Sequence, residues 1–245
     1  MTDTKLMQGD VVIPLDSAFE YHENEFWVVT PSSPAKAGNY SLHLEFDGSL
    51  VIGITGFYKS VYKNKNGDEV PIATSKFQPT DARKAFPCFD EPSFKSTFTV
   101  TLVRPSEGYI ALSNMPVQNE SMNLPSAGKC FLKIIFFYHM IHFILGLTEA
   151  MFEKSVPMVT YLACFIVCDF EFEEKLTSIH GTKFRVYATP AQKHRVAYAL
   201  DIGANITDYF TDYFTVPYPL PKQDMIAIPD FSSGAMEHWG LITYR

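Results

Sequence analysis

Apolar and polar residues alternate along much of the first half of the chain. The stretch NYSLHLEF, residues 39–46, places an apolar side chain at every second position, and SFKSTFTVTLVRP, residues 93–105, does the same in part. Turn-forming residues such as those of KNGDEV, residues 65–70, separate the apolar segments. A period of two with short turns is typical of β-strands, and strands at such close intervals favour a large antiparallel sheet or sandwich over βαβ units.

The pattern changes after about residue 184. FRVYATP, residues 184–190, reads as one more strand. The following segment, residues 191–214, has the spacing of an amphipathic helix, with apolar residues at positions 196, 199, 200, 203, 206, 209 and 210. A proline-rich connection leads to DMIAIPDF and HWGLITYR, which we expect to be two strands. We therefore expect a β domain at residues 1–184 and a second domain beginning at residues 185–245.

Composition limits the classes of protein. The 245 residues are 47% hydrophobic and 19% charged, which is enough apolar material for a core and argues against disorder. The net charge of −7 makes a nucleic-acid partner held through phosphate contacts an unfavourable interpretation.

The cysteines give no metal signature. Cys164 and Cys168 flank FIV, so in a strand they face the same side and are too far apart along it for an easy disulfide. We expect free buried thiols. No pair among Cys88, Cys130, Cys164 and Cys168 has the CxxC spacing of a zinc site.

Residues 130–145, CFLKIIFFYHMIHFIL, form an unusually apolar run. The run is short for a membrane span and contains Lys133, His139 and His142. The polar start MTDTKLMQGD does not read as a signal peptide. If the protein is anchored to a membrane, we expect the anchor to lie in sequence preceding residue 1.

Glu237, in the stretch DFSSGAMEHWG, is a candidate ligand-binding residue. Gly234 and Ala235 precede it, and such small residues let a ligand backbone approach closely. A carboxylate there could pair with an ammonium group; a loop acid in a surface salt bridge is the simpler alternative. His238 points to the opposite face of a regular strand, exposed or packed.

The segment KFQPTDARKAFPCFDEP, residues 76–92, is a second candidate. Its prolines indicate a rigid loop that fixes the aromatic residues. A structural interpretation pairs Arg83 with Asp90 or Glu91. Gln78 is the residue that this interpretation does not explain.

Four segments in order carry a family resemblance: AFPCFDEPSFKSTF, EKSVPMVTYLACFIV, YPLPKQDMIAIPDF and GAMEHWGLITYR. Together they resemble the zinc aminopeptidases of the gluzincin class, of the membrane-bound and endoplasmic-reticulum types. The match covers most of the chain except about residues 127–146, which look inserted.

The resemblance implies a mainly β fold. It would consist of a saddle-like antiparallel β domain, followed by the start of a thermolysin-like α/β catalytic domain with a strand, a long helix and a β hairpin. It also implies that Glu237 binds the free α-amino group of a peptide, that Gly234, Ala235 and Met236 line the peptide, and that His238 belongs to the same substrate-binding set. Gln78 matches a second amine-binding position, and Lys76 a position near the first side-chain pocket.

Two departures from the family pattern qualify these roles. His238 stands where the family's Gly-Ala-Met-Glu-Asn motif has asparagine, and an imidazole is larger and can be charged. The family's zinc motif, His-Glu-x-x-His with a later glutamate, follows the Glu237 motif and is not found in this sequence. We therefore expect the intact parent to bind Zn²⁺ through residues outside this chain.

The function expected is that of a zinc metalloaminopeptidase that removes N-terminal residues from peptides. This chain would supply recognition of the substrate's free N-terminus and would be inactive alone, with its truncated domain leaving apolar surface of the helix exposed. The alternatives are an inactive peptide-binding or interaction module and a non-functional gene-model fragment. Sequons at Asn39, Asn119 and Asn205 lean toward a secretory-lumen parent, with a cytoplasmic one as the alternative.

Overall fold

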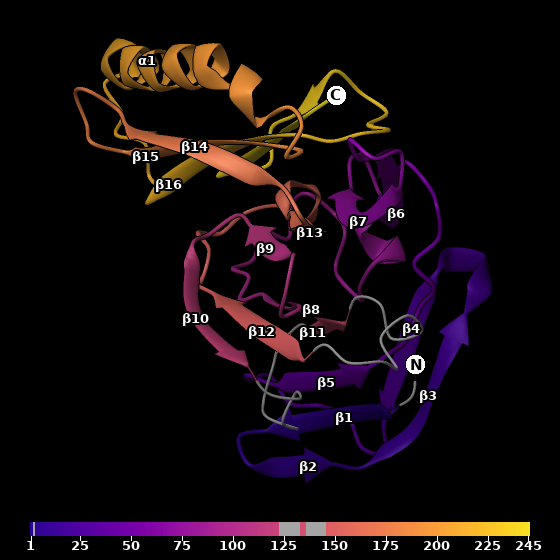
Figure 1. The fold of residues 1–245 in the computed structure, drawn as a ribbon. Coiled ribbons are helices and arrows are strands. Elements are labelled where there is room, and N and C mark those ends of the chain that lie inside the picture. The colour runs from indigo at the N-terminus through magenta and orange to yellow at the C-terminus, as the bar shows by residue number, and fades with distance from the viewer. Residues whose placement is uncertain (2, 123–132, 136–145) are drawn as a thin grey trace. The chain divides into compact units, whose positions relative to one another are not determined.

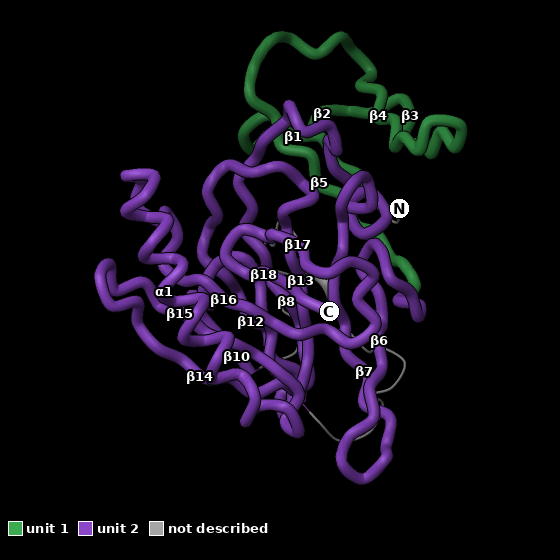
Figure 2. The backbone as a smooth tube through the Cα atoms, turned by 90° about the horizontal axis from the view of Figure 1, so that it is seen from above, with its two compact units in different colours: residues 1–49 green, residues 50–245 purple. Residues whose placement is uncertain are grey.

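The computed structural model describes residues 1, 3–122, 133–135 and 146–245, and the chain divides into two compact units, residues 1–49 and 50–245 (Figure 2). Most of the atypical segment 127–146, including His139 and His142, lies outside the described residues, as does Cys130. The candidate site residues all belong to the second unit.

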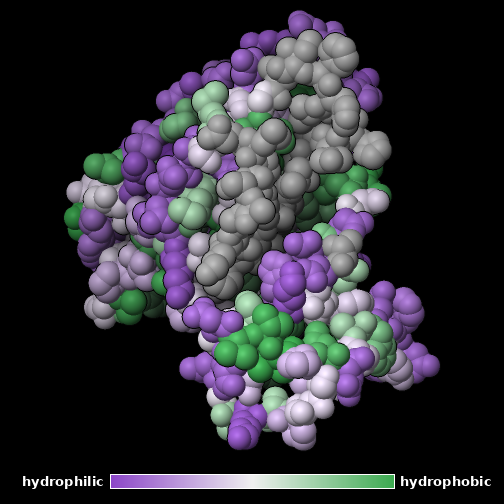
Figure 3. All heavy atoms as spheres, turned by 90° about the horizontal axis from the view of Figure 1, so that it is seen from below, coloured by the Kyte–Doolittle hydropathy of each residue, from purple (hydrophilic) through white to green (hydrophobic). Residues whose placement is uncertain are grey.

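The first unit contains two small antiparallel sheets, ordered β2-β1-β5 and β3-β4. None of its described residues is fully buried, and it exposes large apolar side chains such as Val11 and Phe26. Figure 3, which shows the molecule from below, contains an apolar patch on that face. The elements are β1 (Asp3–Gln8), β2 (Val11–Ile13), β3 (Leu15–Tyr21), η1 (His22–Asn24), β4 (Phe26–Pro31) and β5 (Ser41–Glu45).

The described residues of the second unit form three sheets and one α-helix (Figure 1). The sheets have the strand orders β10-β12-β8-β11, β6-β7-β13-β9 and β14-β15-β16-β18-β17. The strands are β6 (Gly56–Lys63), β7 (Glu69–Lys76), β8 (Thr101–Pro105), β9 (Ile110–Ser113), β10 (Val117–Met122), β11 (Lys133–Ile135), β12 (Leu147–Phe152), β13 (Phe165–Cys168), β14 (Glu171–Leu176), β15 (Lys183–Ala188), β16 (Lys222–Ala227), β17 (Ala235–Met236) and β18 (Leu241–Tyr244). The helices are η2 (Ala82–Lys84), η3 (Thr160–Leu162), η4 (Lys193–Arg195) and α1 (Ala197–Phe214).

The β6-β7-β13-β9 sheet, called the middle sheet below, is buried on both faces at strand β13. Phe165 and Val167 pack into one core cluster with Leu102 and Phe152 of the β10-β12-β8-β11 sheet. Cys164, Ile166 and Cys168 pack into a second cluster with residues of the five-stranded sheet, including Ile226 and Leu241. A strand that is covered on both faces has a nearly continuous run of apolar residues in its sequence, as this segment does.

The cysteine prediction is confirmed for the residues described. Cys164 and Cys168 are buried free thiols in the same cluster, and Cys88 is a free thiol of intermediate exposure. Burial raises the pKa of all three thiols to about 12. These groups therefore stay protonated and unreactive near neutral pH.

Helix α1 covers one face of the five-stranded sheet (Figure 1). Val196 and Ala204 pack against Phe184, and at Gly203 a Cβ atom would lie 2.4 Å from the Cζ atom of Phe184. The predicted helix is therefore present, and the exposed apolar surface expected on it is found in its second half. Ile206, Tyr209 and Phe210 are exposed, because Asp208 and Thr211 occupy the sheet side there.

One strand prediction needs correction. Within residues 94–100, Ser96 forms only an isolated bridge with Met158, and the regular strand β8 begins at Thr101. The strands expected in DMIAIPDF and HWGLITYR are present as β16 and β18, which lie parallel, and β18 also pairs with β17 inside the motif. Within the atypical segment, Lys133–Ile135 adds a parallel strand to β8. No described helix has the length and hydropathy that a membrane span requires.

Candidate functional site

The β17–β18 hairpin positions the motif that contains Glu237. Ala235 pairs with Tyr244 and Met236 with Thr243, and the Arg245 amide donates to the Gly234 carbonyl at 3.1 Å. Because side chains alternate along the extended backbone, Met236 is buried, Glu237 exposed and His238 buried. The hairpin thus presents the carboxylate outward.

The backbone before Glu237 is open. Gly234 and Ala235 are exposed, and a Cβ atom placed on Gly234 would meet no other atom within 4 Å. The peptide groups here can therefore be approached by another chain, as the small residues led us to expect.

Gln78 follows β7, the strand beside β13 in the middle sheet. Lys76 at the end of β7 is 4% exposed, and Phe77 is fully enclosed in the core, so the backbone leading to Gln78 is held firmly. The Lys76 ammonium donates to the Gln78 carbonyl at 3.1 Å and to its Oε1 atom at 3.4 Å. Gln78 itself is exposed.

Lys76 links the two candidate residues electrostatically. Burial lowers the pKa of Lys76, while the Glu237 and Asp81 carboxylates oppose that shift. The ammonium that contacts Gln78 therefore also interacts with the charge of Glu237, about 160 positions later in the sequence.

His238 is enclosed beneath the hairpin. The residue is 1% exposed; its Nδ1 atom lies 3.3 Å from the Thr243 Oγ1 atom, and its Nε2 atom has no hydrogen-bond partner within the described part of the chain. Burial, and secondarily the charge of Lys76, lowers the pKa of His238 to about 3. The imidazole is therefore neutral at physiological pH and packs behind the motif rather than beside Glu237.

The loop after Gln78 matches the structural interpretation made from the sequence. Arg83 Nε donates to Asp90 Oδ2 at 2.9 Å, and the same carboxyl group accepts a hydrogen bond from the Thr160 hydroxyl. These contacts fix the loop against η3. Gln78 takes no part in the contacts between Arg83, Asp90 and Thr160 and is exposed.

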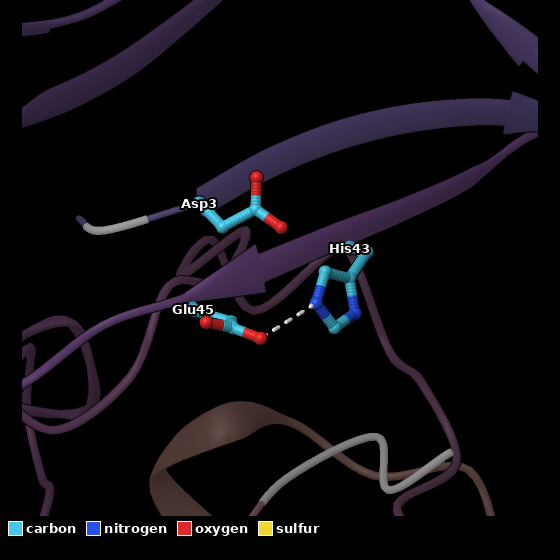
Figure 4. Close-up of side chains that lie close together, drawn as sticks. All are labelled: Asp3, His43 and Glu45. Atoms are coloured by element: carbon cyan, nitrogen blue, oxygen red, sulfur yellow. Dashed lines mark ion pairs between the residues drawn. The ribbon is translucent and has the colours of Figure 1, made fainter. Parts of the chain in front are cut away.

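The residues around the motif do not form a metal site. Among the described residues, one group of three metal-ligating side chains has its donor atoms within 4.8 Å of one another, namely Asp3, His43 and Glu45. They lie on neighbouring strands β1 and β5 of the first unit (Figure 4). Lys5 already forms an ion pair with Asp3, which lowers the pKa of that carboxyl group. Neither this group nor Glu237 with the inward-facing His238 fits a buried zinc centre.

An open hollow of about 570 Å³ lies elsewhere, against α1. Its lining contains Tyr209, Tyr213, Asp208 and Asp212, and none of the predicted site residues. No residue of the Glu237 motif is among the residues that line it.

Sequence reasoning missed two polar residues that contact the motif from behind, Asn114 and Lys222. Both are at most 3% exposed, and each donates to two backbone carbonyls of residues distant in the sequence. Lys222 stands beside Gln223 and Asp224 in a polar stretch, and Asn114 stands in LSNMP, so neither residue had a local signal of this role.

Comparison with known families agrees with this arrangement. The model of the peptidase M1 N-terminal domain matches residues 7–129, and that of the peptidase family M1 domain matches residues 198–245. The chain thus combines the β-rich N-terminal domain of a metallopeptidase with part of a peptidase domain. It belongs to peptidase family M1.

Individual relatives are aminopeptidases. The chain is 44% identical over 231 residues to glutamyl aminopeptidase of Sus scrofa. This match covers 93% of the chain and 22% of the relative. It is 43% identical over 251 residues to the human glutamyl aminopeptidase, covering 100% of this chain and 24% of the relative. Endoplasmic reticulum aminopeptidase 1 of Mus musculus is 40% identical over 227 residues, 92% of this chain and 22% of the relative. The chain therefore spans less than a quarter of the length of these relatives.

Proposed function

We propose that this chain supplies the N-terminus recognition of a zinc metalloaminopeptidase that removes N-terminal residues from peptides. Glu237 would pair with the substrate's α-ammonium group, and Gln78 would accept a second hydrogen bond from it. The observation that supports this proposal is that Glu237 and Gln78 are both exposed, while the Lys76 ammonium contacts Gln78 and interacts with the charge of Glu237.

The physical logic is that of an exopeptidase. A fixed carboxylate selects a charged chain end because an internal amide cannot supply the ammonium charge. The amide oxygen of Gln78 accepts a hydrogen bond without adding a second negative charge. Gly234 and Ala235 would leave room for the peptide backbone beside Glu237.

Zinc binding is part of what we propose for the whole protein. When bound, zinc would supply an activated water for hydrolysis. The described residues around Glu237 do not fit a zinc site, so we assign no step of the reaction to them beyond binding and orienting the peptide's end.

Lys76 adds a selective element to the proposed site. A buried ammonium beside the amine-binding residues favours an acidic side chain in the first residue of the peptide and disfavours a basic one. This agrees with the name of the glutamyl aminopeptidase relatives.

The test is binding of a peptide with a free N-terminus, Ala-Phe-Ala amide, and of its N-acetylated form, measured by calorimetry. We expect the free peptide to bind about tenfold or more tightly, since a charge-assisted hydrogen bond is worth about 1.5–3 kcal/mol. Glu237→Gln should remove most of this preference. Equal affinity of the wild-type chain for both peptides would contradict the proposal.

A second experiment separates binding from turnover. With added zinc and an aminoacyl chromogenic substrate, we expect the purified chain to show no hydrolysis. Turnover that both a chelator and Glu237→Ala abolish would show instead that the chain is itself an enzyme. Binding without turnover is also the result expected of the second candidate function, a peptide-binding module, which shares the same recognition site.

A further inference from the structure

Lys222 lies at the start of β16 and is almost completely buried. Its ammonium lies 2.8 Å from each of three oxygens, those of the Asp224 carboxylate, the Ser113 carbonyl and the Gly240 carbonyl. All three donor positions of the side chain are therefore used. Ser113 ends β9 of the middle sheet, whereas Gly240 follows the Glu237 motif, so one side chain ties the two segments together.

Asn114, the residue after Ser113, also connects the loop after β9 with the segment after Glu237. Its Nδ2 atom donates to the carbonyls of Leu162 and Trp239, both at 2.8 Å, and its Oδ1 atom accepts from the Cys164 amide at 2.9 Å. The residue is 3% exposed. Because water cannot replace these partners, breaking one contact leaves a buried carbonyl without a donor.

The backbone itself is in close contact at this point. Gly240 has φ +86°, and a Cβ atom on it would lie 2.3 Å from the Asn114 carbonyl oxygen. Only glycine fits here, since both the left-handed conformation and the contact exclude a side chain. The segment after Glu237 thus rests directly on the loop after β9.

A short route leads from this contact to Gln78. Cys164, which donates to Asn114, is followed by Phe165, whose amide donates to the Ser75 hydroxyl at 2.9 Å. Ser75 lies in β7, three positions before Gln78. The two residues assigned to the substrate amine are therefore joined through Asn114 by buried hydrogen bonds and two short lengths of strand.

We propose that Asn114 and Lys222 are positioning residues that fix the β17–β18 hairpin to the middle sheet and thereby set the position of Glu237 relative to Gln78. We call these two side chains with their carbonyl partners the Asn114–Lys222 bridge. The role in recognition rests on the function proposed above; the mechanical role does not. Neither residue contacts the peptide.

Three variants act on the bridge in different ways. Asn114→Asp keeps the acceptor for Cys164 and removes the two donated hydrogen bonds; Lys222→Met keeps the length of the stem and removes the ammonium. Gly240→Ala adds a methyl group without removing a polar contact. Arg104→Met is the matched control, because Arg104 is also buried and donates to the carbonyls of Pro105 and Ser106, but in the β10-β12-β8-β11 sheet.

The first readout is amide hydrogen exchange under native conditions. In the bridge variants we expect exchange in residues 235–244 to rise about tenfold or more relative to residues 147–152 of β12, since a local opening loses buried hydrogen bonds. Arg104→Met should not raise exchange in 235–244 relative to 147–152. An unchanged hairpin, or an equal rise in both segments, would overturn the mechanical role.

The second readout is the ratio of affinities for Ala-Phe-Ala amide and its N-acetylated form. The bridge variants should lose about tenfold of the preference for the free N-terminus, and the control should keep it. Faster hairpin exchange with an unchanged ratio would overturn the role in recognition. A wild-type chain that binds both peptides equally removes the proposed function and that role with it, while the exchange data still decide the mechanical role.

Discussion

The two faces of the five-stranded sheet are covered in different ways. The inner face packs Tyr187, Ile226 and Met236 against the middle sheet and is further tied to it by Asn114 and Lys222. The outer face is covered by α1, whose own outer side exposes aromatic residues such as Tyr209 and Phe210. The inner face is thus held by contacts distant in sequence and the outer face by neighbouring ones, which indicates that the motif depends on the β-rich region more than on the helix.

The largest expected effect compares one phenylalanine from each region. Phe165 is fully buried and contacts the rings of Phe77 and Phe86, so Phe165→Ala should lower the free energy of unfolding by about 3–5 kcal/mol. Phe210 is 48% exposed, so Phe210→Ala should cost about 0.5 kcal/mol or less. Denaturant titration measures both.

Equal costs for the two changes would contradict the comparison and show that the outer side of α1 is covered in solution. If Phe165→Ala does not fold, Phe165→Leu provides a milder change at the same position. It should still cost more than Phe210→Leu.

The second effect is the acid sensitivity that His238 gives to the inner face. Its pKa in the folded chain is about 3, below the ordinary value of 6.5, so the unfolded chain binds the proton first and stability is lost as pH falls below 6.5. Between pH 6.5 and 5 the loss attributable to His238 should reach about 2 kcal/mol. His238→Asn should flatten this part of the stability profile.

The control for His238 is His194→Asn, because the His194 side chain is exposed. This change should leave the slope of stability against pH as it is in the wild type. A slope that His238→Asn leaves unchanged would mean that the imidazole is hydrated or partnered in solution.

The third effect tests the contact between α1 and the sheet. At Gly203 a Cβ atom would lie 2.4 Å from Phe184 and 3.0 Å from Met225, so Gly203→Ala should destabilise the chain by about 1–3 kcal/mol. Without that contact, alanine would stabilise the helix by about 1 kcal/mol. Gly48→Ala, which meets open space, is the control and should be nearly neutral. Stabilisation by Gly203→Ala would place the helix farther from β15.

The smallest effect concerns selectivity at the site. Lys76→Met should reduce any preference for Glu-Phe-Ala amide over Lys-Phe-Ala amide, by about 1 kcal/mol for an ammonium near a partly exposed site. Calorimetry with the two peptides measures it. A preference that survives the change would assign selectivity to another residue.

The sequence predicted the parts of the fold that follow from local pattern. The run around Cys164 and Cys168 predicted a strand with buried thiols, and the helical spacing predicted α1. The inward side of α1 could not be predicted beyond Gly203, because the sheet-facing positions at Asp208 and Thr211 are polar. Asp208 accepts hydrogen bonds from the amides of Ile179 and His180, partners that only the fold brings near.

The candidate site was likewise predictable from the sequence only in part. The alternation of Glu237 and His238 followed from the strand pattern, and their family role followed from the motif. The proximity of Gln78 and the contacts of Asn114 and Lys222 depend on tertiary structure. Most of their partners are backbone carbonyls, which every residue type possesses, so the sequence carries little mark of them.

The central claim is that Glu237 and Gln78 hold the same ammonium group, and a double-mutant cycle tests it most directly. The affinity for Ala-Phe-Ala amide is measured in the wild-type chain, in Glu237→Gln, in Gln78→Ala and in the double variant. If both residues contact one ammonium, the losses should be non-additive by about 0.5–3 kcal/mol. Losses that add within about 0.3–0.5 kcal/mol would show that the two residues act independently and would contradict the account.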